Sequence, residues 1–306
     1  MNRLINFLLI GLLNFNANVE SEIECGLSLH ENVSPVKRWM LNSTISLPKF
    51  NPWNVLISGK DKTCGGVLVQ IYPNTKCSEI VLTSSQCFID KEGHRINHAD
   101  YKVYLGGHSF NENKKTTTIS VGIKQITVME FDKQTMQNDL AMLILETTVP
   151  FDYNIRGICL PHYTFDIKHA DWISLTGWKT HTSRKNYGLR SSGILQNIPI
   201  ITLSEEECEE IIPIFHKNYH TCGIHSTKYF YKHRTAVDIG SPLLFQASSR
   251  RFVYGLYSGR HFSNNKTEDV LLFHKIGNSV LWLIRSYTPD IKYSEISIID
   301  PMMYET

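Results

Sequence analysis

The fold of this chain is constrained most by a succession of short apolar runs that begins near residue 50. Each run is rich in β-branched and aromatic residues, and turn-forming segments separate one run from the next. This pattern is typical of β-strands rather than helices, so the sequence predicts an all-β barrel or sandwich. With 42% hydrophobic residues, the 306-residue chain can also bury a sizeable core. The runs are Asn54–Ile57, Gly66–Val69, Ile80–Thr83, Tyr101–Leu105, Leu140–Leu145, Trp172–Gly177 and Arg251–Leu256.

Two segments have helical patterns instead. Ser204–Glu207 predicts a capped helix start, because a hydroxyl precedes carboxylates in the first turn. Ile276–Tyr287 places its apolar residues on one helical face, and Pro289 ends it. Residues 289–306 carry no strong pattern and are expected to form a tail.

The N-terminus has the pattern of a secretory signal peptide. Arg3 precedes the apolar run Leu4–Leu13, and a cleavage position follows at Ala17 or near Ser21. The alternative is a membrane anchor, but the run is about half of the ~20 residues that a spanning helix requires. No later segment is long and apolar enough to span a bilayer, so we expect a secreted, extracellular protein without a membrane partner.

The chain has seven cysteines, and this odd number leaves at least one without a partner inside the molecule. Secretion would place these cysteines in an oxidising compartment, where disulfides persist. Three Asn-X-Ser/Thr sequons, at Asn32, Asn42 and Asn265, permit N-glycosylation in the same setting.

Charge and metal-ligand patterns exclude several function classes. The formal net charge is +2, which argues against a strongly charged partner such as nucleic acid. The 13 histidines lack metal-ligand spacing, and Gly106–Asn113 lacks the carboxylate cluster of a calcium loop. We expect neither a metal ion nor another cofactor.

A series of motifs between about residues 25 and 288 resembles the chymotrypsin-like (S1) serine proteases. Thr235–Leu243 is similar to the family's nucleophile loop Gly-Asp-Ser-Gly-Gly-Pro-Leu, and Ile80–Cys87 to its Val-Leu-Thr-Ala-Ala-His-Cys segment. The resemblance implies two packed six-stranded antiparallel β-barrels with a C-terminal helix and a site between the barrels. The other landmarks, in chain order, are Pro52–Val55, Cys64–Gly66, Asn138–Leu143, Ile158–Pro161, Leu175–Trp178 and Trp282.

The resemblance also implies a domain organisation and a set of disulfides. It divides the chain into a signal peptide (1–21), a propeptide-like segment (22–39), a trypsin-like homology domain (40–288) and the tail (289–306). The implied pairs are Cys25–Cys159, Cys64–Cys87 and Cys208–Cys222, which leaves Cys77 over. Cys77 is then either a semi-buried free thiol or a partner in an intermolecular disulfide. The family's bridge at the nucleophile loop is absent, because Thr235 stands at its first position.

The catalytic positions implied by the resemblance hold unsuitable residues. Acyl transfer in this family requires a serine, a histidine and an aspartate. The corresponding residues are Ile239, Gln86 and Asp139. A glutamine amide does not titrate near neutral pH and an isoleucine has no nucleophilic atom, so only Asp139 matches. Ser241 is the nearest hydroxyl to Ile239, but it matches a family glycine and has no candidate base.

The neighbouring family positions are altered as well. Val237 stands at the oxyanion-hole glycine, and we expect its peptide to turn away from the catalytic orientation. His233, Arg260 and Leu271 fall at positions that line the substrate pocket, which predicts a filled or narrowed pocket. Lys37-Arg38 occupies the window of the activation site without the usual Ile-Val-Gly-Gly, so it is either a cleavable pair or an exposed linker. Asp238, which would pair with a new amino terminus, is then expected to serve the turn alone.

These features together predict a secreted pseudoenzyme, a serine protease homologue without catalysis. The resemblance implies that it binds a protein partner, namely an active protease, a zymogen or an inhibitor, as a cofactor or a decoy. Two alternatives stay open. One is a hydrolase with residual or unconventional activity, and the other is a structural secreted protein whose loops bind an unrelated ligand.

Overall fold

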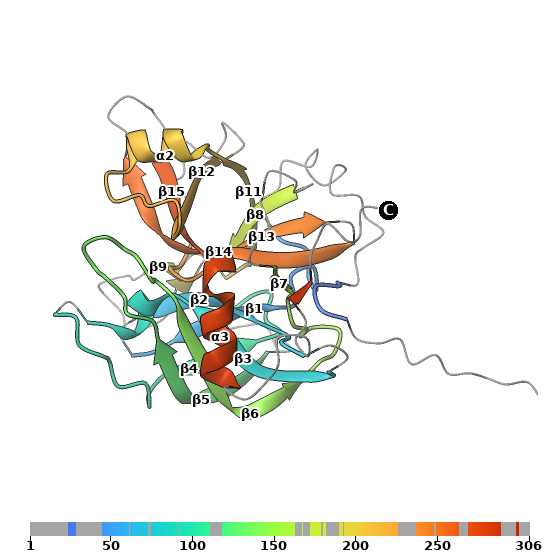
Figure 1. Ribbon diagram of the computed structural model, residues 1–306. Coiled ribbons are helices and arrows are strands. Elements are labelled where there is room, and N and C mark those ends of the chain that lie inside the picture. The colour runs from blue at the N-terminus through green and yellow to red at the C-terminus, as the bar shows by residue number, and fades with distance from the viewer. Residues whose placement is uncertain are drawn as a thin grey trace, which may run out of the picture.

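Two β-barrels make up most of the described structure (Figure 1). No helix in the described part of the chain is long and apolar enough to cross a membrane. The computed structural model describes residues 24–28, 45–60, 62–72, 75–90, 92–110, 118–162, 167, 172–178, 180–181, 190–191, 193–225, 237–247, 249–262, 269–288 and 298–299.

The first barrel closes in the spatial order β1-β2-β3-β6-β5-β4, and every pairing in it is antiparallel. Its inward-facing side chains form one core that includes Val55, Val81 and Leu143. The strands are β1 (Asn54–Ser58), β2 (Thr63–Leu68), β3 (Cys77–Thr83), β4 (Lys102–Leu105), β5 (Ile119–Val128) and β6 (Ala141–Pro150).

The second barrel closes in the order β11-β12-β15-β14-β13-β8 and is also antiparallel throughout. Phe245 and Phe252 stack at 5.0 Å in its core, on neighbouring strands. The strands are β8 (Trp172–Gly177), β11 (Gln196–Thr202), β12 (His220–His225), β13 (Pro242–Ala247), β14 (Arg250–Phe262) and β15 (Asp269–Lys275).

The prediction of two six-stranded antiparallel barrels is therefore confirmed. Each of the seven apolar runs lies within or overlaps a barrel strand, and the run Trp172–Gly177 coincides with β8. Five further strands lie outside those runs: β5, β11, β12, β13 and β15. The run at 251–256 marks only part of β14, which continues through the polar residues 258–261 because β15 pairs with it there.

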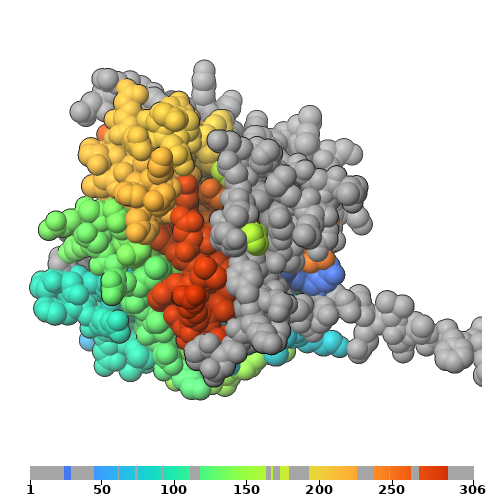
Figure 2. Space-filling model, in the orientation of Figure 1, coloured from blue at the N-terminus to red at the C-terminus, as the bar shows by residue number. Residues whose placement is uncertain are grey.

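A third core joins the two barrels to the C-terminal helix α3 (Val280–Tyr287). Trp53 and Leu82 from the first barrel side meet Leu244 and Val253 from the second, and Leu283 of the helix packs against the same cluster. Figure 2 shows the outer face of α3 (red) at the molecular surface beside first-barrel residues (green). Burial of these apolar side chains fixes how the barrels meet, and therefore positions any site at their junction.

Both predicted helices are present, with one difference. Ser204 caps α2 (Glu205–Ile211) through a capping box, in which its Oγ accepts the Glu207 N–H and the Glu207 carboxylate accepts the Ser204 N–H. The helix predicted from Ile276 begins at Val280 instead, because the preceding residues Gly277–Ser279 form a separate 3-10 turn. The side chain of Leu281 on the exposed face of α3 is 41% accessible.

Part of the expected tail is structured. Ile298–Ile299 (β16) pairs in parallel with β7 (Leu160–Pro161), next to the Cys25–Cys159 disulfide. Two residues are too few to show the alternation of polar and apolar residues that predicts a strand. The pairing itself uses backbone groups, so it leaves no signal in the side chains either. A second short pair joins β9 (Thr180–His181) to β10 (Arg190–Ser191).

Candidate functional site

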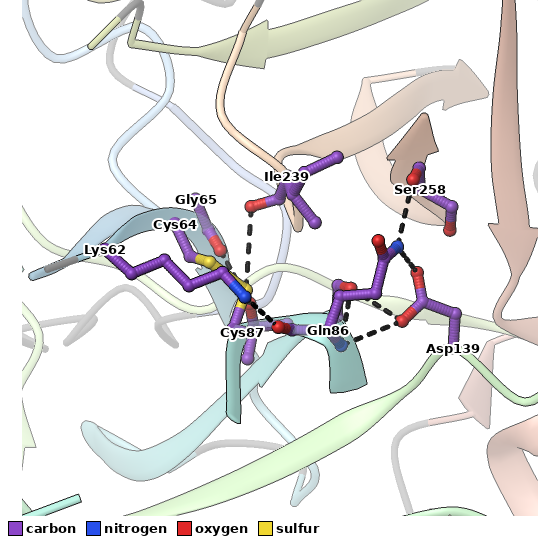
Figure 3. The surroundings of a disulfide bond; sticks show 10 residues. Lys62, Cys64, Gly65, Gln86, Cys87, Asp139, Ile239 and Ser258 are labelled. Atoms are coloured by element: carbon purple, nitrogen blue, oxygen red, sulfur yellow. Dashed lines mark hydrogen bonds between the residues drawn. A yellow bond between two sulfur atoms is a disulfide. The ribbon is translucent and has the colours of Figure 1, made fainter. Parts of the chain in front are cut away.

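The segment around Gln86 is a 3-10 turn that the protein holds from two sides. The turn spans Ser85–Phe88, and the Ser84 Oγ accepts the backbone N–H of Gln86 at 3.1 Å. A disulfide joins Cys87 to Cys64 on β2, so the turn cannot separate from the first barrel. Figure 3 shows Gln86 beside this disulfide and facing Asp139.

Asp139 lies two residues before the start of β6 and is fully buried. Its Oδ1 accepts the Ser84 hydroxyl at 2.6 Å and the Gln86 backbone N–H at 3.2 Å, while Oδ2 accepts the Gln86 side-chain N–H at 2.8 Å. Burial raises the pKa of the Asp139 carboxyl, and hydrogen bonds from Ser258, Ser84 and Gln86 oppose that rise. A buried carboxylate of this kind depends on its donors, because an unpaired buried charge destabilises the fold.

The Gln86 side chain also reaches the second barrel. Its Nε2 donates to the Ser258 backbone carbonyl at 2.9 Å. The ladder between β14 and β15 skips Ser258, because Tyr257 pairs with Phe273 and Gly259 with Leu272. Both partners of Nε2 are oxygen atoms that accept hydrogen bonds. The amide atom that faces them must therefore be the nitrogen, which donates, and not the oxygen. One side-chain nitrogen therefore links the two barrels.

Ile239 lies in the turn that precedes β13, and its partly buried side chain packs against the cores of both barrels. Its backbone carbonyl accepts the Gly65 N–H at 2.8 Å. The next residue, Gly240, has φ +83, and a Cβ there would approach the Thr83 Oγ1 to 2.4 Å. A glycine is needed here for both conformation and space, so the turn is tightly held with an apolar side chain at its tip.

Ser241 is fully buried, so its hydroxyl is not positioned to meet a substrate. A Cβ on Gly65 or Gly177 would lie 2.3 Å from the Ser241 Oγ, so the hydroxyl fills space that these two glycines leave open. Within the described residues, this Oγ has no hydrogen-bond partner. Val237 is likewise buried and belongs to the second barrel core, and the N–H of Asp238 donates to the Trp178 carbonyl at 3.1 Å.

The positions assigned to the substrate pocket are only partly described. Leu271 is 3% exposed in the second barrel core, opposite Arg260 in the β14–β15 ladder. The Arg260 guanidinium lies 3.4 Å from Asp269 and stacks 5.2 Å from the ring centroid of Phe262. His233 lies outside the described residues. A filled pocket therefore stays a prediction.

Several other predicted features also lie outside the described residues. These are the signal peptide, the Lys37-Arg38 pair, Thr235 and the three sequon residues Asn32, Asn42 and Asn265. Among the residues that are described, no group of three or more histidines, cysteines or acids could hold a metal ion.

The three disulfides implied by the resemblance are present: Cys25–Cys159, Cys64–Cys87 and Cys208–Cys222. Cys77 is free and exposed, so the expectation of a semi-buried thiol is wrong. Cys77 is exposed because it begins β3 opposite Pro150, the last residue of β6, where both strands leave the core.

Three residues of the site escaped sequence reasoning. Ser84 and Ser258 supply contacts to the Asp139–Gln86 pair, and Lys62 donates from its Nζ to the Gln86 backbone carbonyl. The Ser84-Ser85-Gln86 order is a signal for a side-chain cap on a short turn. Nothing local in the sequence connects Lys62 or Ser258 to Gln86.

Two closed six-stranded barrels with a hydrogen-bonded cluster at their junction define the trypsin class of fold. The family model for trypsin matches residues 44–283, and the chain belongs to this trypsin-like S1 serine protease family. No catalytic role for this chain follows from membership alone, because function depends on the residues of the site.

Curated relatives carry the same relationship at low identity. Duodenase-1 of Bos taurus is 27% identical over 231 residues, which is 74% of this chain and 78% of the relative. Granzyme B(G,H) of Mus musculus is 28% identical over 166 residues, covering 53% of this chain and 59% of the relative. The Suppressor of tumorigenicity 14 protein homolog of Bos taurus is 29% identical, and the match spans 53% of this chain but only 18% of that longer protein.

Proposed function

We propose that this chain is a secreted, non-catalytic member of the trypsin-like family that acts by binding another protein. The observation that carries the proposal is the contact pattern of the Gln86 side chain, whose Nε2 donates to Asp139 at 2.8 Å and to Ser258 at 2.9 Å. We place Gln86 at the histidine position of the triad, Asp139 at the aspartate and Ile239 at the serine.

This contact pattern opposes acyl transfer at the proton-transfer step. Both N–H groups of Nε2 have acceptors, and the amide has no basic nitrogen that could take a proton from a nucleophile. Gln86 thus keeps the structural contact that a histidine would make with Asp139 while lacking the histidine's titration. The pair then serves to satisfy a buried carboxylate rather than to move protons.

The nucleophile is lacking as well under this proposal. The Ile239 side chain packs against both barrel cores, and an aliphatic side chain cannot form an ester. The nearby Ser241 hydroxyl is fully buried, so it does not replace the missing serine. Gln86 also engages the Ser258 carbonyl on the Ser258-Gly259-Arg260 strand, which corresponds to the family strand that pairs with a substrate backbone.

The binding role, the compartment and the domain limits complete the proposal. The partner would be an active protease, a zymogen or an inhibitor, met outside the cell. Three disulfides in the described residues support an oxidising compartment. The proposed homology domain, residues 40–288, contains the matched region 44–283, and residues 1–21 and 22–39 would be the signal peptide and the propeptide-like segment.

The catalytic part is tested with purified protein, intact and after cleavage near Arg38. The protein is assayed with peptide and ester substrates and with a serine-directed fluorophosphonate probe, and an active trypsin-family protease serves as the positive control. We expect neither turnover nor labelling. Turnover or labelling that disappears in a Ser241→Ala variant would contradict the proposal and favour an unconventional hydrolase.

The binding part needs a separate measurement. Purified protein is immobilised and challenged with individual active trypsin-family proteases, their zymogens and their protein inhibitors. We expect saturable binding of at least one member of these classes. Binding to none of them would favour the alternative of a structural protein with an unrelated ligand.

A further inference from the structure

A cavity of about 710 Å³ lies on the first barrel side of Gln86. This volume is in the range of small-molecule sites, which usually measure ~300–1,000 Å³. Tyr101 and Phe131 contribute aromatic rings to its wall, and Ile89 and Ile96 add aliphatic surface. A small apolar or aromatic body therefore has a matching surface here.

Lys62 lines the same cavity and has an unusual environment for a lysine. The side chain is partly buried, and its Nζ donates to the backbone carbonyl of Gln86 (Figure 3). Among the described residues, no carboxylate oxygen lies within 4.0 Å of this nitrogen. Partial burial favours the uncharged amine of Lys62, because desolvation penalises the ammonium and no carboxylate of the described residues lies beside it to offset that cost.

Burial and the nearby negative charge act on Lys62 in opposite directions. Burial lowers the pKa of the Lys62 ammonium, and the negative charge of Asp139 opposes that shift. The other charged side chains that face the cavity are Lys60, Lys133, Asp90, Glu92 and Asp100. Asp90 is engaged locally, because its Oδ1 accepts the backbone N–H groups of Glu92 and His94.

We propose that Lys62 is a nucleophilic amine that forms an imine with small carbonyl compounds held in this cavity. In the neutral amine one N–H donates to the Gln86 carbonyl and the lone pair remains for attack. The lone pair adds to the carbonyl carbon, and a proton moves from nitrogen to oxygen to give a carbinolamine. Loss of that hydroxyl with the second nitrogen-bound hydrogen, as water, leaves the imine. No oxidant or reductant is required, and the step needs no member of the protease triad.

The aromatic lining selects the class of carbonyl compound. Phe131 and the largely buried Tyr101 line the cavity, so a flat ring can pack beside aromatic side chains there, and Lys62, which lines the same cavity, supplies the reacting nitrogen. An aromatic aldehyde therefore combines a reactive carbonyl with a body that fits, whereas a small hydrophilic aldehyde gains nothing from the rings.

The test uses benzaldehyde and the full chain at pH 7, with sodium cyanoborohydride to trap imines as benzylamines. Peptide mapping by mass spectrometry then gives a separate rate for each lysine. We expect Lys62 to react faster than Lys60, because burial lowers the pKa of the Lys62 ammonium and so leaves more of this lysine as neutral amine at pH 7. An equal or slower rate at Lys62 would overturn the proposal. Both lysines face the same cavity, so wild-type protein supplies its own control.

Two variants sharpen the comparison. Lys62→Arg keeps a donor for the Gln86 carbonyl but cannot form an imine, so the fast fraction of the labelling should disappear. Lys60→Arg removes the neighbouring exposed amine and should leave the fast fraction unchanged. Acetaldehyde at the same concentration should label Lys62 with less preference over Lys60 than benzaldehyde does. An equal preference would show that the aromatic wall has no part in selection and would overturn that part of the proposal.

Discussion

The side-chain amide of Gln86 donates to the buried carboxylate of Asp139 at 2.8 Å. These residues come from different parts of the first barrel, 53 positions apart in the chain. The same amide nitrogen holds the Ser258 carbonyl of the second barrel. Gln86 is therefore expected to contribute to stability more than a partly buried glutamine usually does, because removing it leaves a buried charge with fewer donors.

The first prediction concerns this contact. Gln86→Ala should lower the free energy of unfolding by about 2–4 kcal/mol, because Asp139 loses one donor and the Ser258 carbonyl loses its bond. The measurement is urea unfolding at pH 7. Gln134 is exposed, and Gln134→Ala is the matched control, with an expected change within about 0.5 kcal/mol. Equal effects of the two substitutions would show that the Gln86 contacts contribute nothing.

The second prediction treats Ile239 as a packing residue. Ile239→Ser should destabilise the protein by about 2 kcal/mol, because the side chain leaves apolar contacts with both barrel cores. Ile239→Val removes one methylene and should cost about 1 kcal/mol or less. Both values come from thermal or urea unfolding. A serine variant as stable as the wild type would mean that the site tolerates a hydroxyl without loss.

The third prediction concerns the buried hydroxyl of Ser241. Ser241→Ala should stabilise the fold by about 1 kcal/mol, because it removes a buried polar atom that has no partner within the described residues. Ser241→Val should destabilise it by about 2 kcal/mol or more, because Gly65 and Gly177 leave no room for a larger side chain. A loss of stability in the alanine variant would indicate that the hydroxyl has a partner after all.

The fourth prediction is a pH dependence. His274 is fully buried, and burial lowers the pKa of its imidazole to about 3. The unfolded chain takes up this proton below about pH 6.5, whereas the folded protein does not until about pH 3, so stability is lost as the pH falls through that window. At pH 4.5 the loss from His274 should be about 3 kcal/mol relative to pH 7.

A variant separates this effect from those of other groups. His274→Gln should lose about 3 kcal/mol less than the wild type between pH 7 and pH 4.5, as measured by urea unfolding at both values. The buried Asp139 acts in the opposite direction, since its raised pKa makes the folded protein take up a proton first. Asp139 is present in both proteins, so the difference between them reports His274. Parallel pH profiles would refute the assignment.

The fold was predictable because its signals are local and repeated. Runs such as Ile80–Thr83 and Trp172–Gly177 become barrel strands since their side chains suit a pleated, half-buried surface. The capping box at Ser204 was also readable, because the donor and acceptor lie three positions apart. The pairing of β16 with β7 could not be predicted from the sequence, because backbone groups form it and every residue type carries them.

For the candidate site, the sequence predicted only which residue types stand at the positions of the family motifs. The sequence indicated Gln86, Asp139 and Ile239 by resemblance, and the chemistry of an amide and an aliphatic side chain follows from their identity. The exposure of Cys77 depends instead on where β3 and β6 leave the core. Likewise, the room that Gly65 and Gly177 leave for Ser241 arises only where β2, β8 and the turn before β13 converge.

The sequence alone was sufficient for the barrel architecture, for the disulfide pairs that the family resemblance implies, and for the absence of a basic nitrogen at residue 86. The contacts of that residue depended on tertiary structure, because Gln86 and Ser258 are 172 positions apart and meet only when the two barrels pack. The environment of Lys62 also depended on tertiary structure, because its Nζ donates to the Gln86 backbone carbonyl and its side chain lines a cavity. Local patterns depend on residues a few positions apart, whereas burial, pKa and cavity shape depend on segments that only folding brings together.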